Sequence, residues 1–195
     1  MGRRFLITGT GVGVGKTTVG CALGFAVRAR GMRVGVMKPI DSIESQDAQA
    51  LALAVGSTIP PELICPYRYR SALERDRLPA PALAHIARCF REIAAHNDVM
   101  LVESASMINF ADLAAMLNLE VIVVVGNRPG CMDATTLALQ GCDSRGIKVA
   151  GCVLCDCDPA TETDEASLQG LLGVLYLGRM RHREPLARTI VEKLV

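Results

Sequence analysis

The sequence predicts an α/β protein of three layers, in which one parallel sheet is covered by helices on both faces. Short, continuous apolar runs alternate along the chain with segments whose apolar residues recur at helical spacing. Half of the residues are hydrophobic and only 4% are aromatic, which is typical of an α/β core rich in Ala, Val and Leu. Neither an internal repeat nor a low-complexity linker interrupts the sequence, so we expect a single domain over residues 1–195.

Up to residue 95, apolar runs and turn residues place the expected elements. Gly31 and Gly56 each follow a helical segment and supply a C-terminal stop. Five of the nine prolines fall between residues 58 and 81, which predicts a long surface loop there. The expected elements are, in order, a strand over 5–7, a helix ending near 28–31, a strand within 33–40, a helix over 48–55, the loop over 58–81 and a helix over 82–95.

Strands and helices continue to alternate in the second half of the chain. The run Glu-Val-Ile-Val-Val-Val-Gly at 120–126 is the clearest strand, because a parallel strand covered on both faces is apolar throughout. The expected elements are, in order, a strand over 98–103, a helix over 110–117, the strand over 120–126, a helix over about 133–144, a strand over 147–154, a helix over 161–173, a strand over 173–178 and a helix from about 184.

A glycine-rich loop between the first strand and the first helix predicts a nucleotide-phosphate site and a fold of P-loop NTPase type. Glycines let backbone N–H groups face a polyphosphate, and the start of a helix favours anions. Lys16 is expected to reach the terminal phosphates, and the Thr17 hydroxyl is expected to bind Mg²⁺. The predicted nucleotide-binding residues of this loop are Gly9, Thr10, Gly11, Val12, Gly13, Val14, Gly15, Lys16, Thr17 and Thr18.

The spacing of this loop is unusual. Five residues separate Gly9 from Gly15, one more than in the common pattern G-x-x-x-x-G-K-[ST]. A glycine-rich turn that binds nothing is the alternative interpretation. Four alternating glycines followed by Lys-Thr-Thr disfavour it.

Three charged residues are candidates for the same site, and each has an alternative. Lys38 ends the second strand, where ligands gather in open α/β sheets, but a lysine at a strand end can equally be solvated. Glu103 ends another strand and resembles the second magnesium carboxylate of P-loop enzymes, or it merely terminates the strand. Asp47 either caps the helix over 48–55 or faces the magnesium, and spacing does not separate the two.

Charge and hydropathy exclude several classes of partner. The net charge of +1 gives no reason to expect nucleic acid or an anionic membrane surface. No apolar run approaches the ~18 residues that a membrane span requires. The basic start Met-Gly-Arg-Arg runs directly into the first strand, unlike a signal peptide, and we expect a cytoplasmic protein.

The eight cysteines include Cys152, Cys155 and Cys157, whose C-x-x-C-x-C spacing allows a metal site. The same residues lie in a segment that is typical of a buried strand. Because side chains alternate along a strand, Cys152 and Cys155 are expected on opposite faces. Buried free thiols are therefore the favoured interpretation.

Two classes of P-loop protein are disfavoured by missing motifs. Small GTPases recognise guanine with N-K-x-D, whereas the nearest segment here, 127–130, is Asn-Arg-Pro-Gly. MinD-like ATPases carry a second lysine in the loop, and its position here is Gly11.

The ordered set of motifs resembles the dethiobiotin synthetase family along the whole chain. No single segment is decisive, but their order is specific. The similar segments are Gly9–Thr17 (family G-T-D-T-x-V-G-K-T), Lys38–Ser42 (K-P-[VI]-x-[ST]), Asp47–Leu51 (D-A-x-x-L), Cys65–Tyr69 (Pro-Tyr), Val102–Met107 (V-E-G-A-G-G), Asp112–Cys131 (ending V-V-G-x-x-x-G-C) and the L-x-L-G run that ends at Gly178.

This resemblance implies an ATP- and Mg²⁺-dependent ligase that forms a carbamate from CO₂ or bicarbonate and 7,8-diaminononanoate, a diamino carboxylate, phosphorylates it and closes a cyclic urea. It implies catalytic roles for Lys16, Lys38 and Ser42, with Ser42 bonding the carbamate, and magnesium ligation by Thr17, Asp47 and Glu103. It also implies a homodimer. The positions that match the family's nucleotide-binding residues near the C-terminus are Cys155 and Gly178.

Departures from the family concentrate at the positions that recognise the substrate and the adenine base in the family. Gly11-Val12-Gly13 replaces Asp-Thr-Glu, and Ser104–Met107 replaces G-A-G-G. Asp133 stands where the family has an Asn that holds the substrate carboxylate, Cys155 stands for the adenine-reading Asn, and Met180 for the closing Pro.

Three hypotheses follow from this mixture. The chain is a divergent dethiobiotin synthetase, or an amide-forming P-loop ligase with another amine or carboxylate substrate, or a nucleotide-binding regulatory subunit. The retained Lys38 and Glu103 disfavour the third hypothesis, because a mere nucleotide binder has little use for Lys38.

Overall fold

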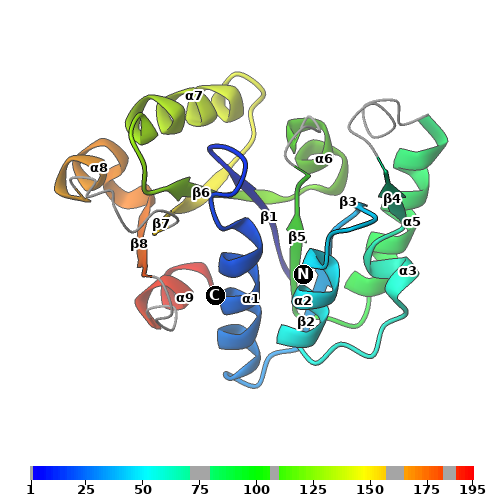
Figure 1. Cartoon of the computed structure of the whole chain (residues 1–195). Coiled ribbons are helices and arrows are strands. Elements are labelled where there is room, and N and C mark those ends of the chain that lie inside the picture. The colour runs from blue at the N-terminus through cyan, green and yellow to red at the C-terminus, as the bar shows by residue number, and fades with distance from the viewer. Residues whose placement is uncertain (1, 71–79, 106–109, 157–164, 182–187) are drawn as a thin grey trace.

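Six parallel strands form the main sheet of the protein. A computed structural model of the chain describes residues 2–70, 80–105, 110–156, 165–181 and 188–195. The strands of the main sheet are β1 (Arg3–Gly9), β2 (Val34–Met37), β5 (Val99–Glu103), β6 (Glu120–Gly126), β7 (Val149–Cys155) and β8 (Tyr176–Met180). Their order across the sheet is β2-β5-β1-β6-β7-β8. β1 is therefore central, and the loop that follows it leaves the middle of the sheet (Figure 1).

Helices cover both faces of this sheet, which confirms the predicted three layers (Figure 1). The helices that pack on one face are α1 (Lys16–Arg28), α2 (Asp47–Ala54) and α9 (Arg188–Leu194). The helices that pack on the other face are α5 (Ala80–Ala94), α6 (Phe110–Leu117), α7 (Cys131–Asp143) and α8 (Glu165–Leu172). In β1, Phe5 and Ile7 join the core under the first group, and Leu6 joins the core under the second.

The same alternation separates the cysteines of β7. Cys152 belongs to the core beneath α5–α8, and Cys155 to the core beneath α1, α2 and α9. The predicted opposite orientation is confirmed, and these two thiols cannot face one common metal ion. Cys157 lies outside the described residues.

The predicted long loop over 58–81 is wrong in part. This segment contains the short helix α3 (Pro61–Ile64) and the strand β4 (Tyr67–Tyr69), which pairs in parallel with β3 (Ile40–Ser42) to form a second, two-stranded sheet. Pro61 is tolerated because it stands in the first turn of α3, where no intrahelical N–H bond is lost. Residues 71–79 lie outside the described part of the chain.

Other predicted boundaries shift by a few residues. α7 begins at Cys131 rather than at residue 133, and β7 spans 149–155 rather than 147–154. The predicted strand over 173–178 begins instead as a 3₁₀ turn (Gly173–Leu175), so β8 starts at Tyr176. The predicted starts of the last two helices, at 161 and 184, fall outside the described residues.

No helix in the described ranges is long and apolar enough to cross a membrane.

Two glycines allow α1 and α2 to approach closely. Gly20 and Gly24 are buried on one face of α1. A Cβ on Gly20 would lie 2.8 Å from Cδ2 of Leu51, and a Cβ on Gly24 would lie 2.6 Å from Cγ1 of Val55. Since α2 carries Asp47 at its first residue, this packing also fixes one side of the site described below.

We expect Gly24→Leu to lower the free energy of unfolding by ~1–3 kcal/mol, because a side chain there must push α2 away. Gly141→Leu is the matched control: position 141 lies in α7, and a Cβ there meets no atom within 4 Å. Its higher helix propensity should leave stability unchanged or raise it by up to about 1 kcal/mol. Urea denaturation measures both, and equal stability of the two variants would contradict the packing.

Candidate active site

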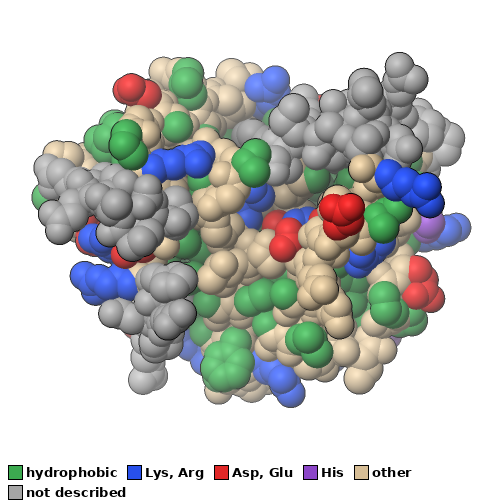
Figure 2. All heavy atoms as spheres, viewed as in Figure 1, with side chains coloured by type: hydrophobic (Ala, Val, Ile, Leu, Met, Phe, Trp, Pro, Cys, Tyr) green, Lys and Arg blue, Asp and Glu red, His purple; other side chains and the backbone are tan. Residues whose placement is uncertain are grey.

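The site lies at the carboxyl edge of the sheet, where β1, β2 and β5 end side by side. Ile7 of β1 is level with Glu103, and Met37 of β2 is level with Val102. Lys38 follows Met37 directly, so the register brings it beside Glu103 and the phosphate loop, residues 9–18 (Figure 1). Figure 2 shows acidic and basic side chains together on this face, between the start of α1 and β3.

The glycines of the phosphate loop are needed for different reasons. Gly13 and Gly15 have φ of 68° and 92°, a region that other residues rarely adopt. A Cβ on Gly15 would also lie 2.5 Å from Sγ of Cys155, and a Cβ on Gly9 would lie 2.5 Å from Cγ2 of Val14. The loop therefore follows a path that side chains at these positions would block.

Backbone and side-chain hydrogen bonds tie the loop to β6. The N–H of Thr10 donates to the carbonyl of Val124 at 3.0 Å, and the Thr10 hydroxyl accepts from the N–H of Gly126 at 3.3 Å. Val14 is fully buried, whereas Val12 is 70% exposed at the crest of the loop. The two ends of the loop are thus fixed and its crest faces outward.

The first turn of α1 supplies the cation and the hydroxyl that the sequence predicts. Lys16, Thr17 and Thr18 are its first three residues, no acidic residue stands in this turn, and Thr18 is exposed. Nζ of Lys16 donates to the carbonyl of Gly11 at 3.3 Å. Burial lowers the pKa of Lys16, and Glu103 opposes this in part. A helix N-terminus with a lysine of this kind favours a bound polyanion.

Lys38 is a buried member of the site rather than a solvated strand end. Its side chain is 6% exposed, and Nζ donates to Oε1 of Glu103 at 2.7 Å and to Oδ2 of Asp47 at 2.5 Å. Oδ1 of Asp41 lies 3.8 Å from the same nitrogen. Burial lowers the pKa of Lys38, but Glu103 and Asp47 outweigh it and the net shift is upward. Lys38 therefore keeps its charge.

Glu103 and Asp47 face this lysine from two sides. Glu103 is 1% exposed, and its Oε1 also accepts from the Thr17 hydroxyl at 2.9 Å. Burial raises the pKa of Glu103, against the opposing charge of Lys38. Burial also acts to raise the pKa of Asp47, but bonding to Lys38 outweighs it and the pKa is lowered. Since α2 begins at Asp47 and the carboxylate bonds Lys38, the cap interpretation of Asp47 is wrong.

These oxygen atoms fit a magnesium ion. Oε2 of Glu103 is buried and has no hydrogen-bond partner, while Thr17 and Asp47 present further oxygens near it. Within the described residues, no group of three or more His, Cys, Asp or Glu could hold a metal by itself. One or two carboxylates with a hydroxyl are typical of Mg²⁺ that is also bound by nucleotide phosphates and water.

Three predicted site residues are less clearly part of this cluster. Ser42 is exposed at the end of β3, and its hydroxyl accepts from the N–H of Ser45 at 3.1 Å. Cys155 is buried and lies against Gly15. Gly178 lies within β8, level with Val153, where a Cβ would be 2.9 Å from Ile190 of α9. Their roles toward substrate and base remain predictions.

The structure adds residues that the sequence analysis did not identify. Asp41 is 7% exposed, and its Oδ2 has no hydrogen-bond partner. Nη1 of Arg128 donates to the carbonyl of Val12 at 3.3 Å. Nδ2 of Asn127 donates to Oδ1 of Asp156 at 2.7 Å, so the ends of β6 and β7 are joined. Asp41 lies inside the Lys-Pro-Ile-Asp-Ser motif, but no spacing rule connects Arg128 with the phosphate loop.

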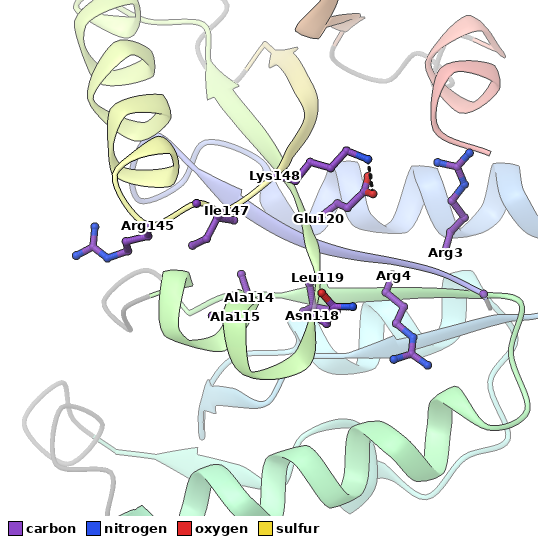
Figure 3. Close-up of a pocket in the computed structure, with 12 residues that line it drawn as sticks. Arg3, Arg4, Ala114, Ala115, Asn118, Leu119, Glu120, Arg145, Ile147 and Lys148 are labelled. Carbon is purple, nitrogen blue, oxygen red and sulfur yellow. Dashed lines mark hydrogen bonds and ion pairs between the residues drawn. The ribbon is translucent and has the colours of Figure 1, made fainter.

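A second hollow of about 500 Å³ lies at the opposite, amino-terminal edge of the sheet (Figure 3). Four cations line it, but Arg3, Arg4 and Arg145 point away from one another, and Lys148 pairs with Glu120 at 2.6 Å. Its charges do not converge on one point, unlike those around Lys38.

Comparisons with known proteins agree with this geometry. The family described as AAA domain matches residues 3–189. The ATP-dependent dethiobiotin synthetase BioD of Anaeromyxobacter dehalogenans (strain 2CP-C) is 36% identical over 202 residues, which cover 95% of this chain and 88% of that protein. The protein of the same name from Xylella fastidiosa (strain M12) is 31% identical over 205 residues, covering 93% of this chain and 91% of that protein.

Among solved structures, the signal recognition particle 54 kDa protein from Aeropyrum pernix K1 in complex with GDP superimposes with a TM-score of 0.65 at 18% identity. The match covers 97% of this chain and 46% of that chain. At this identity the likeness concerns the fold alone, and it confirms the predicted α/β fold of P-loop NTPase type.

We expect Lys38→Met to lower the free energy of unfolding by ~3–5 kcal/mol without ligands, because it leaves Glu103 buried and uncompensated. Lys148→Met is the matched control: it breaks an ion pair whose lysine is 72% exposed and should cost about 0–1 kcal/mol. Adding Glu103→Leu to Lys38→Met should recover part of the loss. Urea denaturation compares the variants, and equal costs for the two single variants would contradict the buried pair.

Proposed function

The chain belongs to the dethiobiotin synthetase family, and we propose on that premise that it is an ATP-dependent cyclo-ligase of biotin biosynthesis. Its substrates are CO₂ or bicarbonate and 7,8-diaminononanoate, and its product is the cyclic urea dethiobiotin. The single observation that carries the proposal is the buried Lys38, which stands between Glu103, Asp47 and the phosphate loop. A cation at this position reduces the repulsion between two anionic reactants.

The chemistry explains why such cations are needed. One amine of the substrate adds to CO₂ and loses a proton, which gives an anionic carbamate. A carbamate oxygen then attacks the γ-phosphorus of ATP while the bond to the β–γ bridging oxygen breaks and ADP leaves. The second amine attacks the carbamoyl carbon and gives up one proton to solvent, phosphate leaves with the carbamate oxygen, and the ring closes. Carbamate and γ-phosphate repel each other, so cations must hold them in line.

The predicted residues of the phosphate loop and those around Lys38 have roles in this scheme. Lys16 binds the terminal phosphates, and Lys38 neutralises the carbamate and γ-phosphate where they meet. Mg²⁺, held by Thr17, Asp47 and Glu103, would draw charge from the phosphate oxygens. The amide N–H groups of the phosphate loop bind the polyphosphate, and Ser42 hydrogen-bonds the carbamate. Ser42 is exposed beside the cluster, which leaves its hydroxyl accessible to a substrate.

A second candidate is an amide-forming ligase that uses another amine or carboxylate. It is favoured by Asp133, which lies in the first turn of α7. An acid at this position repels a substrate carboxylate, whereas the family's Asn would bind one. The phosphate chemistry is the same in both candidates, so the substrate alone distinguishes them.

We also propose that the protein acts as a homodimer in the cytoplasm, as the family does. Sedimentation velocity at micromolar concentration should give a mass of about twice the 20.8 kDa of the chain. The dimer should persist in ~0.5 M salt, because stable homodimer interfaces are largely apolar. A monomer at these concentrations, with or without MgATP, would contradict this proposal.

We expect dethiobiotin, detected by mass spectrometry, when the protein is incubated with MgATP, bicarbonate and 7,8-diaminononanoate. Lys16→Ala should reduce the rate by ~10²-fold or more, because it removes a cation from the transferring phosphate. Lys148→Ala removes a cation from the opposite edge of the sheet and should leave the rate unchanged. EDTA should abolish dethiobiotin formation by the unmodified protein. Nucleotide binding without dethiobiotin would overturn the proposal and favour the second candidate.

A further inference from the structure

Arg128 reaches across from the loop between β6 and α7 to the crest of the phosphate loop. Its Nη1 lies 3.3 Å from the carbonyl oxygen of Val12. Its Nη2 fills the space that a Cβ on Gly11 would need. The guanidinium group therefore lies against the loop at Gly11 and Val12.

Gly11 differs from the other glycines of the loop. Gly13 and Gly15 have positive φ, whereas Gly11 is absent from the positive-φ residues of the described chain. After two atoms of Arg128, the next nearest atom to a Cβ at Gly11 would be Cγ1 of Val14, at an ordinary 3.8 Å. The backbone thus tolerates a side chain at position 11, but the flexible end of Arg128 would have to move aside for it. Gly11 and Arg128 are therefore coupled, because the missing side chain of the glycine leaves room for the guanidinium group.

The base of this arginine is held in place by the backbone. The N–H of Asn127 donates to the carbonyl of Cys155 at 2.8 Å, and the carbonyl of Arg128 accepts from the N–H of Cys131 at 3.1 Å. Gly126 is bonded to Thr10 of the phosphate loop. The distance between the root of Arg128 and the loop is therefore fixed, and the long side chain provides the remaining reach.

Two cations bond successive carbonyls of the same loop. Lys16 bonds the carbonyl of Gly11, and Arg128 bonds that of Val12, both at the long distance of 3.3 Å. The pKa of Lys16 is lowered chiefly by burial, and the charge of Arg128 adds to this. Both donors are charged, and a phosphate oxygen carries a negative charge that a neutral carbonyl lacks, so its bonds to these donors gain an additional electrostatic attraction. A polyphosphate in the loop would therefore draw both cations from the carbonyls.

We propose that Arg128 binds the γ-phosphoryl group of the nucleotide and stabilises it during transfer, as an arginine supplied by the same chain. This inference rests on the proposed function. The bond between the carbamate oxygen and the γ-phosphorus forms while the bond to the β–γ bridging oxygen breaks. The planar guanidinium holds two donors in a fixed fork that matches two oxygens of the group in transit, whereas the three donors of the Lys16 ammonium rotate about a single nitrogen. Arg128 touches the reacting group and is in this sense catalytic.

The test compares the affinities for a non-hydrolysable ATP analogue, Mg–AMP-PNP, and for MgADP by isothermal titration calorimetry. Arg128→Ala should lower the affinity for AMP-PNP by ~10-fold to ~100-fold and leave that for ADP nearly unchanged, because only AMP-PNP carries a γ-phosphoryl group. Arg145→Ala is the matched control. Arg128 precedes α7, whereas Arg145 lies just beyond the other end of that helix, so its removal should leave both affinities unchanged (Figure 3).

A second variant acts on Arg128 without removing its charge. Gly11→Ala should displace the guanidinium from its place against the loop, and its selective loss of AMP-PNP binding should be smaller than that of Arg128→Ala, because the flexible side chain can still reach a phosphate. The double variant Gly11→Ala/Arg128→Ala should be no weaker than Arg128→Ala alone. If the losses of AMP-PNP affinity in the two single variants add in the double variant, position 11 acts on the phosphates independently of Arg128. This result would overturn the coupling of the two residues.

The outcomes separate this inference from the proposed function. An unchanged AMP-PNP to ADP ratio in Arg128→Ala overturns the role of Arg128, even when the protein makes dethiobiotin. Equal losses for both nucleotides also overturn it, since Arg128 would then contact another phosphate. A selective loss in a protein that makes no dethiobiotin supports Arg128 and overturns only the substrate assignment. No binding of either nucleotide to the unmodified protein overturns both.

Discussion

The ion pair between Lys38 and Glu103 connects the elements from which the site is built. It joins the end of β2 to the end of β5, and Glu103 continues the connection to α1 by accepting from Thr17. Asp47 adds the start of α2. Burying such charges is costly unless each is paired, so the pair favours the one arrangement of these elements in which every charge has a partner. The unpartnered Oε2 of Glu103 leaves one position for a further cation.

Much of this arrangement was predictable from the sequence because it depends on local patterns. Continuous apolar runs identify parallel strands, and a charged residue at the end of such a run must emerge at the carboxyl edge. This reasoning located Lys38 and Glu103. The small sheet of β3 and β4 was missed, because it depends on pairing between residues 40–42 and 67–69, which no local pattern reveals. Arg128 was missed for the same reason, since its partner is more than a hundred residues away.

The structure also separates what this chain shares with its family from what is its own. Lys38, Glu103, Asp47 and Thr17, for which we propose phosphate and magnesium binding, form one hydrogen-bonded cluster. Two of the altered residues lie outside this cluster: Asp133 is in the first turn of α7, and Cys155 lies against Gly15. Gly11 lies within the phosphate loop, but its loss of a side chain is matched by an arginine in the vacated space.

In the proposed reaction, Lys16, Lys38 and Mg²⁺ bring a carbamate and a γ-phosphate together so that one oxygen passes between them. The most direct measurement follows that oxygen. In a short incubation with ¹⁸O-labelled CO₂, MgATP and the diamine, the account predicts one ¹⁸O atom in each phosphate released, because the carbamate oxygen leaves with phosphorus. Phosphate without the label would mean that water attacks ATP instead, and this would contradict the account.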